Sequence, residues 1–114
     1  MGFLAAAAFP VLPGQSERVR KFGEELQPNI DEFERLNKET TFTRFQVHLQ
    51  EGPEGDLAIF VFEIEDPSKA RSSFTDSAYD NWWLDYLRDV FGVDLRAMPE
   101  VPDAPPPTFV WPPP

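Results

Sequence analysis

The sequence predicts an α+β fold of the ferredoxin-like type, with the element order β-α-β-β-α-β. Three observations support this: an apolar run comes first, two strand-like runs follow each other directly, and each side of that pair carries a helical pattern. The predicted elements are strands at residues 3–11, 41–50, 57–65 and 108–111, with helical patterns at residues 16–39 and up to Gly92. Such a fold places two helices on one face of a four-stranded antiparallel sheet, so the other face needs a cover.

Length and composition predict one globular domain. The chain has 114 residues, of which 41% are hydrophobic, and it contains 11 Phe and 3 Trp. This is enough for a single two-layer core and too little for a second. We expect the domain to span residues 1–98, followed by a Pro-rich segment at residues 99–114.

Charge and residue usage exclude several classes of partner. The chain is acidic, with a formal charge of −10, and it has no cluster of Lys and Arg interleaved with aromatic residues. Nucleic acid and anionic membranes are therefore not expected as partners. With no Cys and a single His, we expect no metal site and no cofactor.

The first strand is predicted at residues 3–11, which contain four consecutive alanines. A signal peptide would need a basic start, whereas the first charged side chain is Glu17. The interpretation that follows is the first strand of a cytoplasmic protein.

The first helical pattern carries its own start signal and a break. Ser16 is predicted as the N-cap, with Glu17 in the first turn. Apolar residues then recur at three- and four-residue steps, which predicts an amphipathic helix packed on the sheet. Pro28 lies inside the pattern and should kink or split the helix, because proline removes a backbone donor.

The two central runs are predicted to pair as a hairpin around the loop at residues 52–55. If Glu51 lies opposite Asp56, partner numbers sum to 107. That register predicts a helix-facing set of Phe45, Val47, Leu49, Phe60 and Phe62. It predicts an open-facing set of Phe42, Arg44, Gln46, His48, Gln50, Ile59, Val61 and Glu63.

The second helical region is predicted to start twice. Asp66-Pro67 begins a short helix, and Ser77 caps the main helix, which ends at Gly92. The prolines around residues 108–111 suit a fourth strand at the sheet edge, in the order 4-1-3-2. Two PxxP matches, at residues 99–102 and 102–105, leave a polyproline partner motif as the alternative.

The chain resembles the dimeric α/β-barrel superfamily, which includes stress-responsive barrel proteins, cofactor-free monooxygenases and some polyketide cyclases. The resemblance is carried by residues 11–15 (VLPGQ), the strand pair, residues 74–83 (FTDSAYDNWW) and residues 92–95 (GVDL). In detail it is most similar to an uncharacterised bacterial branch. It implies a homodimer whose sheets face each other and enclose a pocket between sheet and helices. Cyclase members use several histidines where this chain has only His48, so no catalytic residue is transferred.

The candidate site combines polar groups of the open face with aromatic groups of the second helix. His48 is the candidate proton-transfer group and Arg44 the group that steadies negative charge. The candidate ligand-binding residues are Gln46, Glu63, Phe42, Tyr79, Trp82, Trp83 and Tyr86. Each also has a structural interpretation: an interface histidine, a cross-strand pair of Arg44 with Glu63, and an aromatic stripe in the core or a dimer interface.

Two functions remain open from sequence. The first is a homodimer that binds an apolar or aromatic small molecule between sheet and helices, either as a binding protein or as a cofactor-free isomerase, cyclase or monooxygenase. The second is a non-catalytic dimerisation or interaction module with a filled sheet interface. A third interpretation, haem binding on the same fold, would make His48 the axial ligand.

Overall fold

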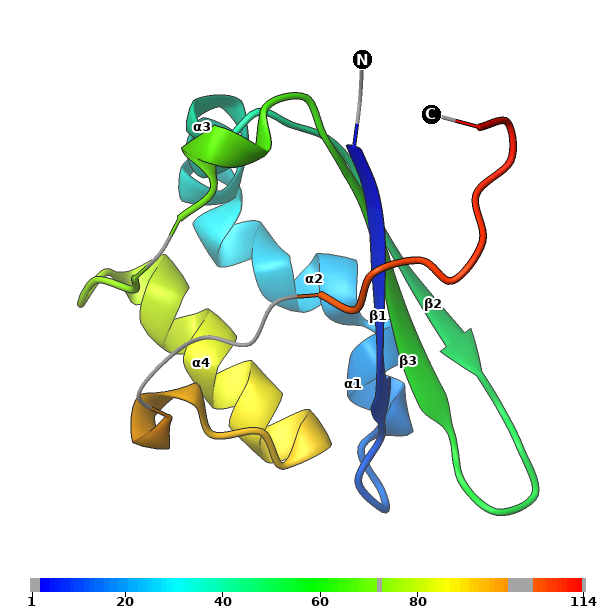
Figure 1. Ribbon diagram of the computed structural model, residues 1–114. Helices are drawn as coiled ribbons and strands as arrows, with labels where there is room; N and C mark the ends of the chain where they lie inside the picture. The colour runs from blue at the N-terminus through cyan, green and yellow to red at the C-terminus, as the bar shows by residue number, and fades with distance from the viewer. Residues whose placement is uncertain (1–2, 72, 99–103, 114) are drawn as a thin grey trace.

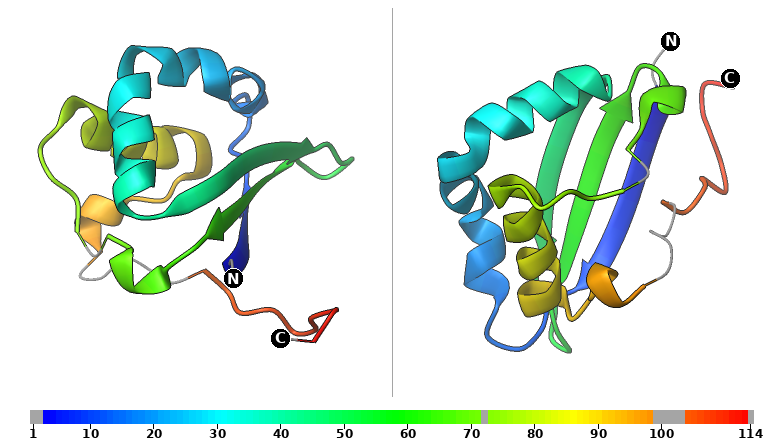
Figure 2. Two further views of the ribbon diagram at one scale, coloured as in Figure 1. Left: turned by 90° about the horizontal axis from the view of Figure 1, so that it is seen from above. Right: turned by 90° about the vertical axis from the view of Figure 1, so that its left-hand side faces the viewer.

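A three-stranded antiparallel sheet forms one layer of the molecule (Figure 1). The computed structural model describes residues 3–71, 73–98 and 104–113. The strands are β1 (Phe3–Pro10), β2 (Phe42–Gln50) and β3 (Leu57–Ile64), and β3 lies in the centre in the order β1-β3-β2. The helices of these described residues all lie on one side of this sheet, and none of them covers the other side (Figure 2). The predicted α+β class and antiparallel sheet are confirmed.

The predicted register of the central hairpin is confirmed. Val47 pairs with Phe60, and Phe45 pairs with Phe62. A β-bulge at Thr43 follows further along β2, because Phe42 pairs with Ile64 while Arg44 pairs with Glu63. One extra residue in a strand moves every side chain beyond it to the opposite face.

The bulge corrects the predicted position of Phe42. Its partner Ile64 is buried on the helix side, and the Phe42 ring stacks on Phe62 with 5.4 Å between centroids. Phe42 therefore belongs to the helix-facing side, because residues paired across an antiparallel sheet point to the same face.

The first helical pattern is divided into four short pieces: α1 (Ser16–Arg20), α2 (Phe22–Leu26), η1 (Gln27–Asn29) and α3 (Ile30–Glu39). Pro28 splits the helix as predicted, since the 3-10 turn η1 contains it. A further break at Lys21 was not predicted. Ser16 does not cap α1 as predicted, because Gln15 holds that position and the Ser16 hydroxyl donates instead to Asp56 at 2.5 Å.

The second helical region has the predicted boundaries. The 3-10 turn η2 (Pro67–Lys69) follows Asp66, whose side chain accepts a bond from the Ser68 amide. Helix α4 (Ala78–Phe91) begins after the N-cap Ser77, whose hydroxyl accepts from the Asp80 amide, and ends at Gly92 with φ of 72°. A last turn, η3 (Leu95–Ala97), follows.

The predicted fourth strand is wrong for the described part of the tail. Residues 104–113 contain no strand, and they run beyond the outer edge of β1 toward the uncovered side of the sheet (Figures 1 and 2). The five prolines among these ten residues lack the N–H that a ladder needs. The predicted domain boundary at residue 99 and the first PxxP match lie outside the described residues.

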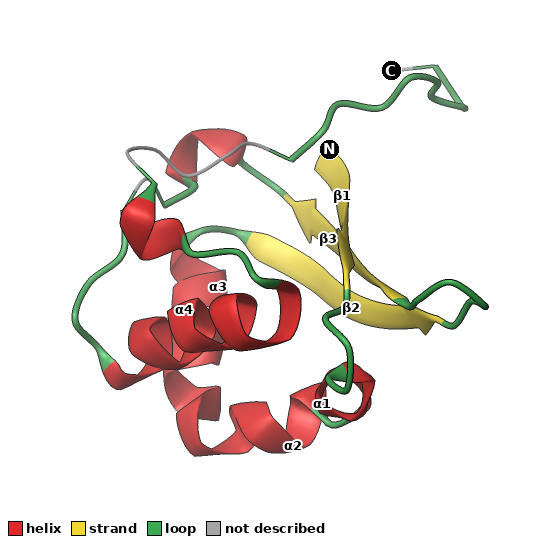
Figure 3. Cartoon of the chain, turned by 90° about the horizontal axis from the view of Figure 1, so that it is seen from below, coloured by secondary structure: helices red, strands yellow, loops and turns green. Residues whose placement is uncertain are grey.

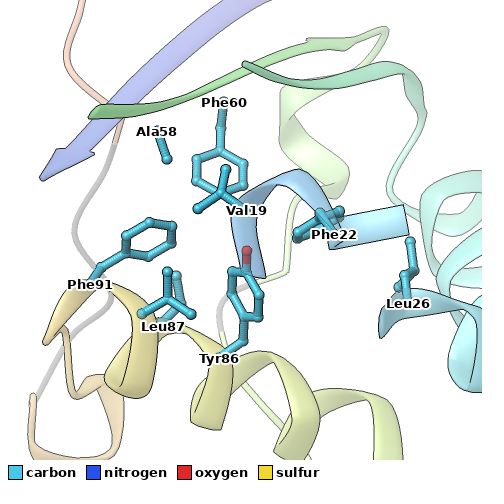
Figure 4. Close-up of a cluster of buried hydrophobic side chains, with 9 residues drawn as sticks. Val19, Phe22, Leu26, Ala58, Phe60, Tyr86, Leu87 and Phe91 are labelled. Atoms are coloured by element: carbon cyan, nitrogen blue, oxygen red, sulfur yellow. The ribbon is translucent and has the colours of Figure 1, made fainter. Parts of the chain in front are cut away.

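The core lies between the helices and the inner face of the sheet (Figure 4). Short helices α1 and α2 contribute Val19, Phe22 and Leu26. The sheet contributes Ala58 and Phe60, and α4 contributes Tyr86, Leu87, Val90 and Phe91. These helix positions recur at three- and four-residue steps, so one stripe of each helix is buried against the sheet. Within the described residues, no helix is long and apolar enough to cross a membrane.

Candidate functional site

A cavity of about 350 Å³ lies between the inner face of the sheet and α4. Its lining comes from all three strands, α4, the loop before α4, the segment after it and the start of the tail. The lining residues are Ala7, Ala8, Phe9, Phe45, Phe60, Phe62, Phe74, Trp83, Leu87, Val93, Leu95, Ala104 and Pro105. The volume falls near the lower end of the range of about 300–1,000 Å³ that is usual for small-molecule pockets.

Phe60 is the centre of the aromatic wall. It comes from the middle of β3, is only 4% exposed, and contacts rings from three other elements edge-on or tilted. The Phe60 centroid lies 5.8 Å from Phe9, 5.9 Å from Trp83 and 6.0 Å from Phe45. Ala7 of β1 lies opposite Phe60 of β3 in the sheet, and the small methyl group of Ala7 leaves room beside the Phe60 ring. Rings fixed by such contacts give the cavity a stiff, flat-walled shape.

An ion pair between the partly exposed Arg71 and the buried Asp80 supports Phe74, which lines the cavity from the loop before α4. The Arg71 guanidinium lies over the Phe74 ring, 5.5 Å from its centroid. The same guanidinium donates to both carboxylate oxygens of Asp80, at 2.9 and 2.5 Å. Asp80 also accepts from the Thr75 amide at 2.7 Å and the Thr75 hydroxyl at 2.9 Å. Asp80 therefore ties the loop that carries Phe74 to the first turn of α4.

These contacts keep the Asp80 carboxyl ionised. Burial by itself raises the pKa of an acid, but the bonds from Arg71 and Thr75 outweigh burial and hold the pKa of Asp80 below its ordinary value. The charge is therefore compensated within the wall of the site and is not offered to a ligand.

The cavity is suited to binding and offers no acid–base group of its own. None of its described lining residues has an ionisable side chain. No group of three or more His, Asp or Glu that could hold a metal occurs in the part of the chain that the structure describes. An uncharged, aromatic ligand fits such a lining, because every buried charge would need a partner that the walls do not supply.

The predicted aromatic stripe of α4 divides between core and cavity. Trp83 lines the cavity, stacked on Tyr86 at 5.9 Å. Tyr86 is fully buried, and its hydroxyl donates to the Arg18 carbonyl at 3.2 Å (Figure 4). Burial raises its pKa well above the ordinary value. Tyr86 is therefore a core residue rather than a ligand contact.

Tyr79 and Trp82 of α4 pack within the helical layer and do not line the cavity. The Tyr79 ring stacks on Trp82 at 6.2 Å and meets Phe33 of α3 edge-on at the same distance. Burial raises the pKa of Tyr79 to about 12. Neither residue lines the cavity, so the two pack α3 against α4.

The polar candidates lie on the opposite face of the sheet from the cavity. His48, Arg44 and Gln46 are exposed side chains of β2, and His48 Nε2 lies 3.4 Å from the Gln46 amide oxygen. Glu63 pairs with Arg44 across the strands. The sheet itself separates this group from the aromatic lining, so within one chain the two halves of the predicted site do not come together.

The expected ion pair of Arg44 with Glu63 is not formed among the described residues. The bulge gives the physical reason, because it brings the Thr43 hydroxyl to the Glu63 carboxylate at 2.7 Å. Glu63 thus bonds to a neutral donor.

Several lining residues were not anticipated as ligand contacts. Phe74 follows a break between two caps, and Val93 and Leu95 follow the Gly92 helix end. The only sequence signal was that apolar residues stand in short connecting segments, where solvent-exposed loops are polar. Phe60 and Phe62 were correctly predicted to face the helices but were not assigned to a site.

A second hollow of about 400 Å³ lies near the turn after β1 and the β2–β3 loop, with Ser16, Glu54 and Asp56 among its lining. The Asp56 carboxylate is already occupied by the Ser16 hydroxyl and the Gly52 amide, and these bonds lower its pKa. We interpret these contacts as bonds that fix the loop.

Comparison with known proteins gives no match: no protein-family model fits the chain, and no curated protein or solved structure is significantly similar to it.

Proposed function

We propose that this protein binds an uncharged apolar or aromatic small molecule in the cavity between its sheet and α4. One observation carries the proposal: a hollow of about 350 Å³ remains inside a helix–sheet layer whose walls are otherwise close-packed aromatic rings. The cavity is partly open to solvent, so a ligand can enter it, and an apolar ligand would remove its apolar lining from water.

The resemblance to dimeric α/β barrels supports the same proposal, since a pocket between sheet and helices is what that superfamily implies. Binding of this kind requires no acid, base or nucleophile in the cavity. His48 and Arg44 remain candidates only for a substrate on the uncovered face of the sheet, because β3 and its neighbours separate them from the cavity.

A neutral fluorescent probe tests the proposal. N-phenyl-1-naphthylamine is uncharged and emits strongly in an apolar site. The decisive pair of variants changes neighbouring alanines of β1: Ala7 lines the cavity, whereas Ala6 is exposed on the other face. We expect the Ala7→Leu variant to weaken probe binding about tenfold or more, because the added carbons take ligand space, and the Ala6→Leu variant to leave binding unchanged.

Failure of the wild-type protein to bind the probe, or equal binding by both folded variants, would contradict the proposal. Circular dichroism and urea unfolding establish that each variant is folded. The His48→Ala variant serves as a further control and should bind the probe like the wild type.

A second candidate function, a homodimerisation module, is favoured by the exposed apolar side chains of the uncovered sheet face. Leu4 is 62% exposed there, and Leu57 is also exposed. An apolar sheet surface left in water promotes association. Sedimentation of the Leu4→Glu variant tests this candidate: a dimeric wild type and a monomeric variant would support it, and a monomeric wild type at micromolar concentration would exclude it.

A further inference from the structure

The tail and the uncovered sheet face present two apolar surfaces in one chain. In the tail, Phe109 and Trp111 are each 80% exposed, with Val110 exposed between them. On the sheet, Ala6 and Ala8 of β1 are exposed, beside the half-buried Ile59 and Val61 of β3. We call Leu4, Ala6, Ala8, Ile59 and Val61 the apolar strip; by register they share the face that the helices do not cover, and Ala8, on the edge strand β1, also borders the cavity.

The side chains of the two surfaces differ in size in a way that suits contact between them. Alanines form the floor of the apolar strip along β1, and leucine, isoleucine and valine rise beside them. Small side chains on a sheet leave a shallow trough, and large flat rings fill it. The Phe109 and Trp111 rings are the most exposed aromatic side chains of the described residues, at 80% against 48% for Phe3.

The charge distribution also permits contact between the tail of one copy and the apolar strip of another copy of this acidic chain. The described tail, residues 104–113, carries no charge. On the uncovered face the charged residues are Arg44 and Glu63, which cancel. Two copies with a formal charge of −10 each repel least where this neutral face meets the neutral tail.

The prolines direct the aromatic residues away from their own sheet. Ala104 and Pro105 line the cavity on the helix side, and the chain then passes the outer edge of β1 (Figures 1 and 3). Three consecutive prolines, residues 105–107, follow, with no glycine up to residue 113. Such a run is a stiff, extended spacer rather than a tight reversal, so it does not fold Phe109 and Trp111 back onto the strip of the same chain.

From these observations we propose that residues 108–111 of one copy dock on the apolar strip of a second copy, in a reciprocal exchange of tails. The inference deepens the dimerisation candidate above and does not depend on ligand binding. Phe and Trp each bury about 150–250 Å², so their four-fifths exposure leaves roughly 300 Å² to be covered in each tail. Two tails and the two strips beneath them give about 1,200 Å² in total, which reaches the lower limit for a specific interface.

Disulfide trapping tests the exchange, because the chain has no cysteine of its own. The Thr108→Cys variant is mixed with the Ala6→Cys or the Ala8→Cys variant under mild oxidation. We expect covalent heterodimers with at least one strip variant. The matched control is the exposed α3 variant Glu34→Cys, which should trap at the background level.

A double variant separates exchange from folding back. The chain with Thr108→Cys and Ala8→Cys together should give linked dimers, whereas a closed monomeric disulfide would overturn the proposal in favour of docking within one chain. Heterodimer yields no higher than those of the Glu34→Cys control would also overturn it.

Truncation after residue 107 gives an independent readout that keeps the cavity residues Ala104 and Pro105. The dimer dissociation constant should rise by a hundredfold or more, since two aromatic anchors are lost from each of the two tails and each contributes about tenfold. An unchanged constant would refute tail exchange even if the dimer exists. Probe binding by the same truncated chain reports on the cavity separately, so failure of one proposal is distinguishable from failure of the other.

Discussion

Removing the Asp80 carboxylate should strongly destabilise the fold, because that side chain is buried and joins the loop before α4 to the helix itself. It is the acceptor in four hydrogen bonds, two from Arg71 and two from Thr75. Bonds to a charged group contribute about 1.5–3 kcal/mol each when unshared, and part of this is recovered because Thr75 is exposed and can bind water. We expect the Asp80→Ala variant to lose about 3 kcal/mol, the lower end of the range for breaking a buried pair, because the Arg71 that is left behind is partly exposed and can bind water.

Urea unfolding at several pH values gives the assay. The folded-state pKa of Asp80 lies below its ordinary value, so the native state favours the ionised form. The stabilisation is fully present above the unfolded pKa of about 4 and is lost as the pH falls through the lower folded pKa. The difference in unfolding free energy between wild type and the isosteric Asp80→Asn variant should therefore shrink below about pH 4.

A matched surface pair supplies the control. Arg35 and Glu39 lie at i and i+4 on α3, 3.0 Å apart and exposed, so the Glu39→Ala variant should lose less than about 0.5 kcal/mol. If Asp80→Ala costs no more than Glu39→Ala, or if its cost does not change between pH 7 and pH 3, the description of Asp80 as a buried, ionised tie is refuted.

Further predictions concern single hydrogen bonds and backbone positions, all measured by urea unfolding. The Tyr86→Phe variant should lose about 1 kcal/mol, because its hydroxyl donates to the Arg18 carbonyl; a loss no larger than that of Tyr79→Phe would argue against this bond. The Gly92→Ala variant should lose about 1 kcal/mol, because φ at Gly92 is 72°. The Gly23→Ala variant, inside α2 with no atom near the added carbon, should instead gain about 0.5–1 kcal/mol. Equal signs at the two glycines would contradict the backbone assignment.

The hairpin could be predicted from sequence because alternation and loop length act on neighbouring residues. Phe45, Val47 and Leu49 alternate with polar side chains, and a single register places all of them on the helix side. The bulge at Thr43 could not be predicted, since an extra residue leaves no mark in an alternating pattern. That bulge moved Phe42 to the other face and gave Glu63 a hydroxyl partner in place of Arg44.

The helix ends were predicted where a side chain forces them and missed where it does not. Pro28 and Gly92 act through their own backbone, and Ser77 acts through a hydrogen bond from an amide three residues on. The break at Lys21 is marked by neither a proline nor a side-chain cap. Ser16 shows the limit of cap rules, because its hydroxyl found a carboxylate 40 residues away.

The cavity illustrates why sites are harder to predict than elements. Its lining draws on segments from Ala7 to Pro105, and which of them meet depends on how α4 and the loop before it pack on the sheet. The sequence groups His48 with the aromatic residues of α4, because an imidazole and aromatic rings are both suited to binding a ligand. The sequence carries no signal that His48 and these rings lie on opposite sides of one sheet.

The composition of the strands indicates that another segment covers part of the uncovered sheet face in the functional protein. It also indicates which part of that face is covered. From Leu57 to Phe62 the central strand β3 is apolar at every position, although a strand with one face in water alternates with polar residues. The neighbouring strand β2 does alternate, with Gln46 and His48 on its outward side. The part of the uncovered face that needs a cover is therefore the part formed by β3 and β1. The part formed by β2 is polar and suited to contact with water. A second full sheet would bury both parts, including the polar groups of β2, at a cost unless each found a partner. A narrow, uncharged segment with large rings would cover only the apolar strip, so the pattern of β2 and β3 favours the tail as the covering element.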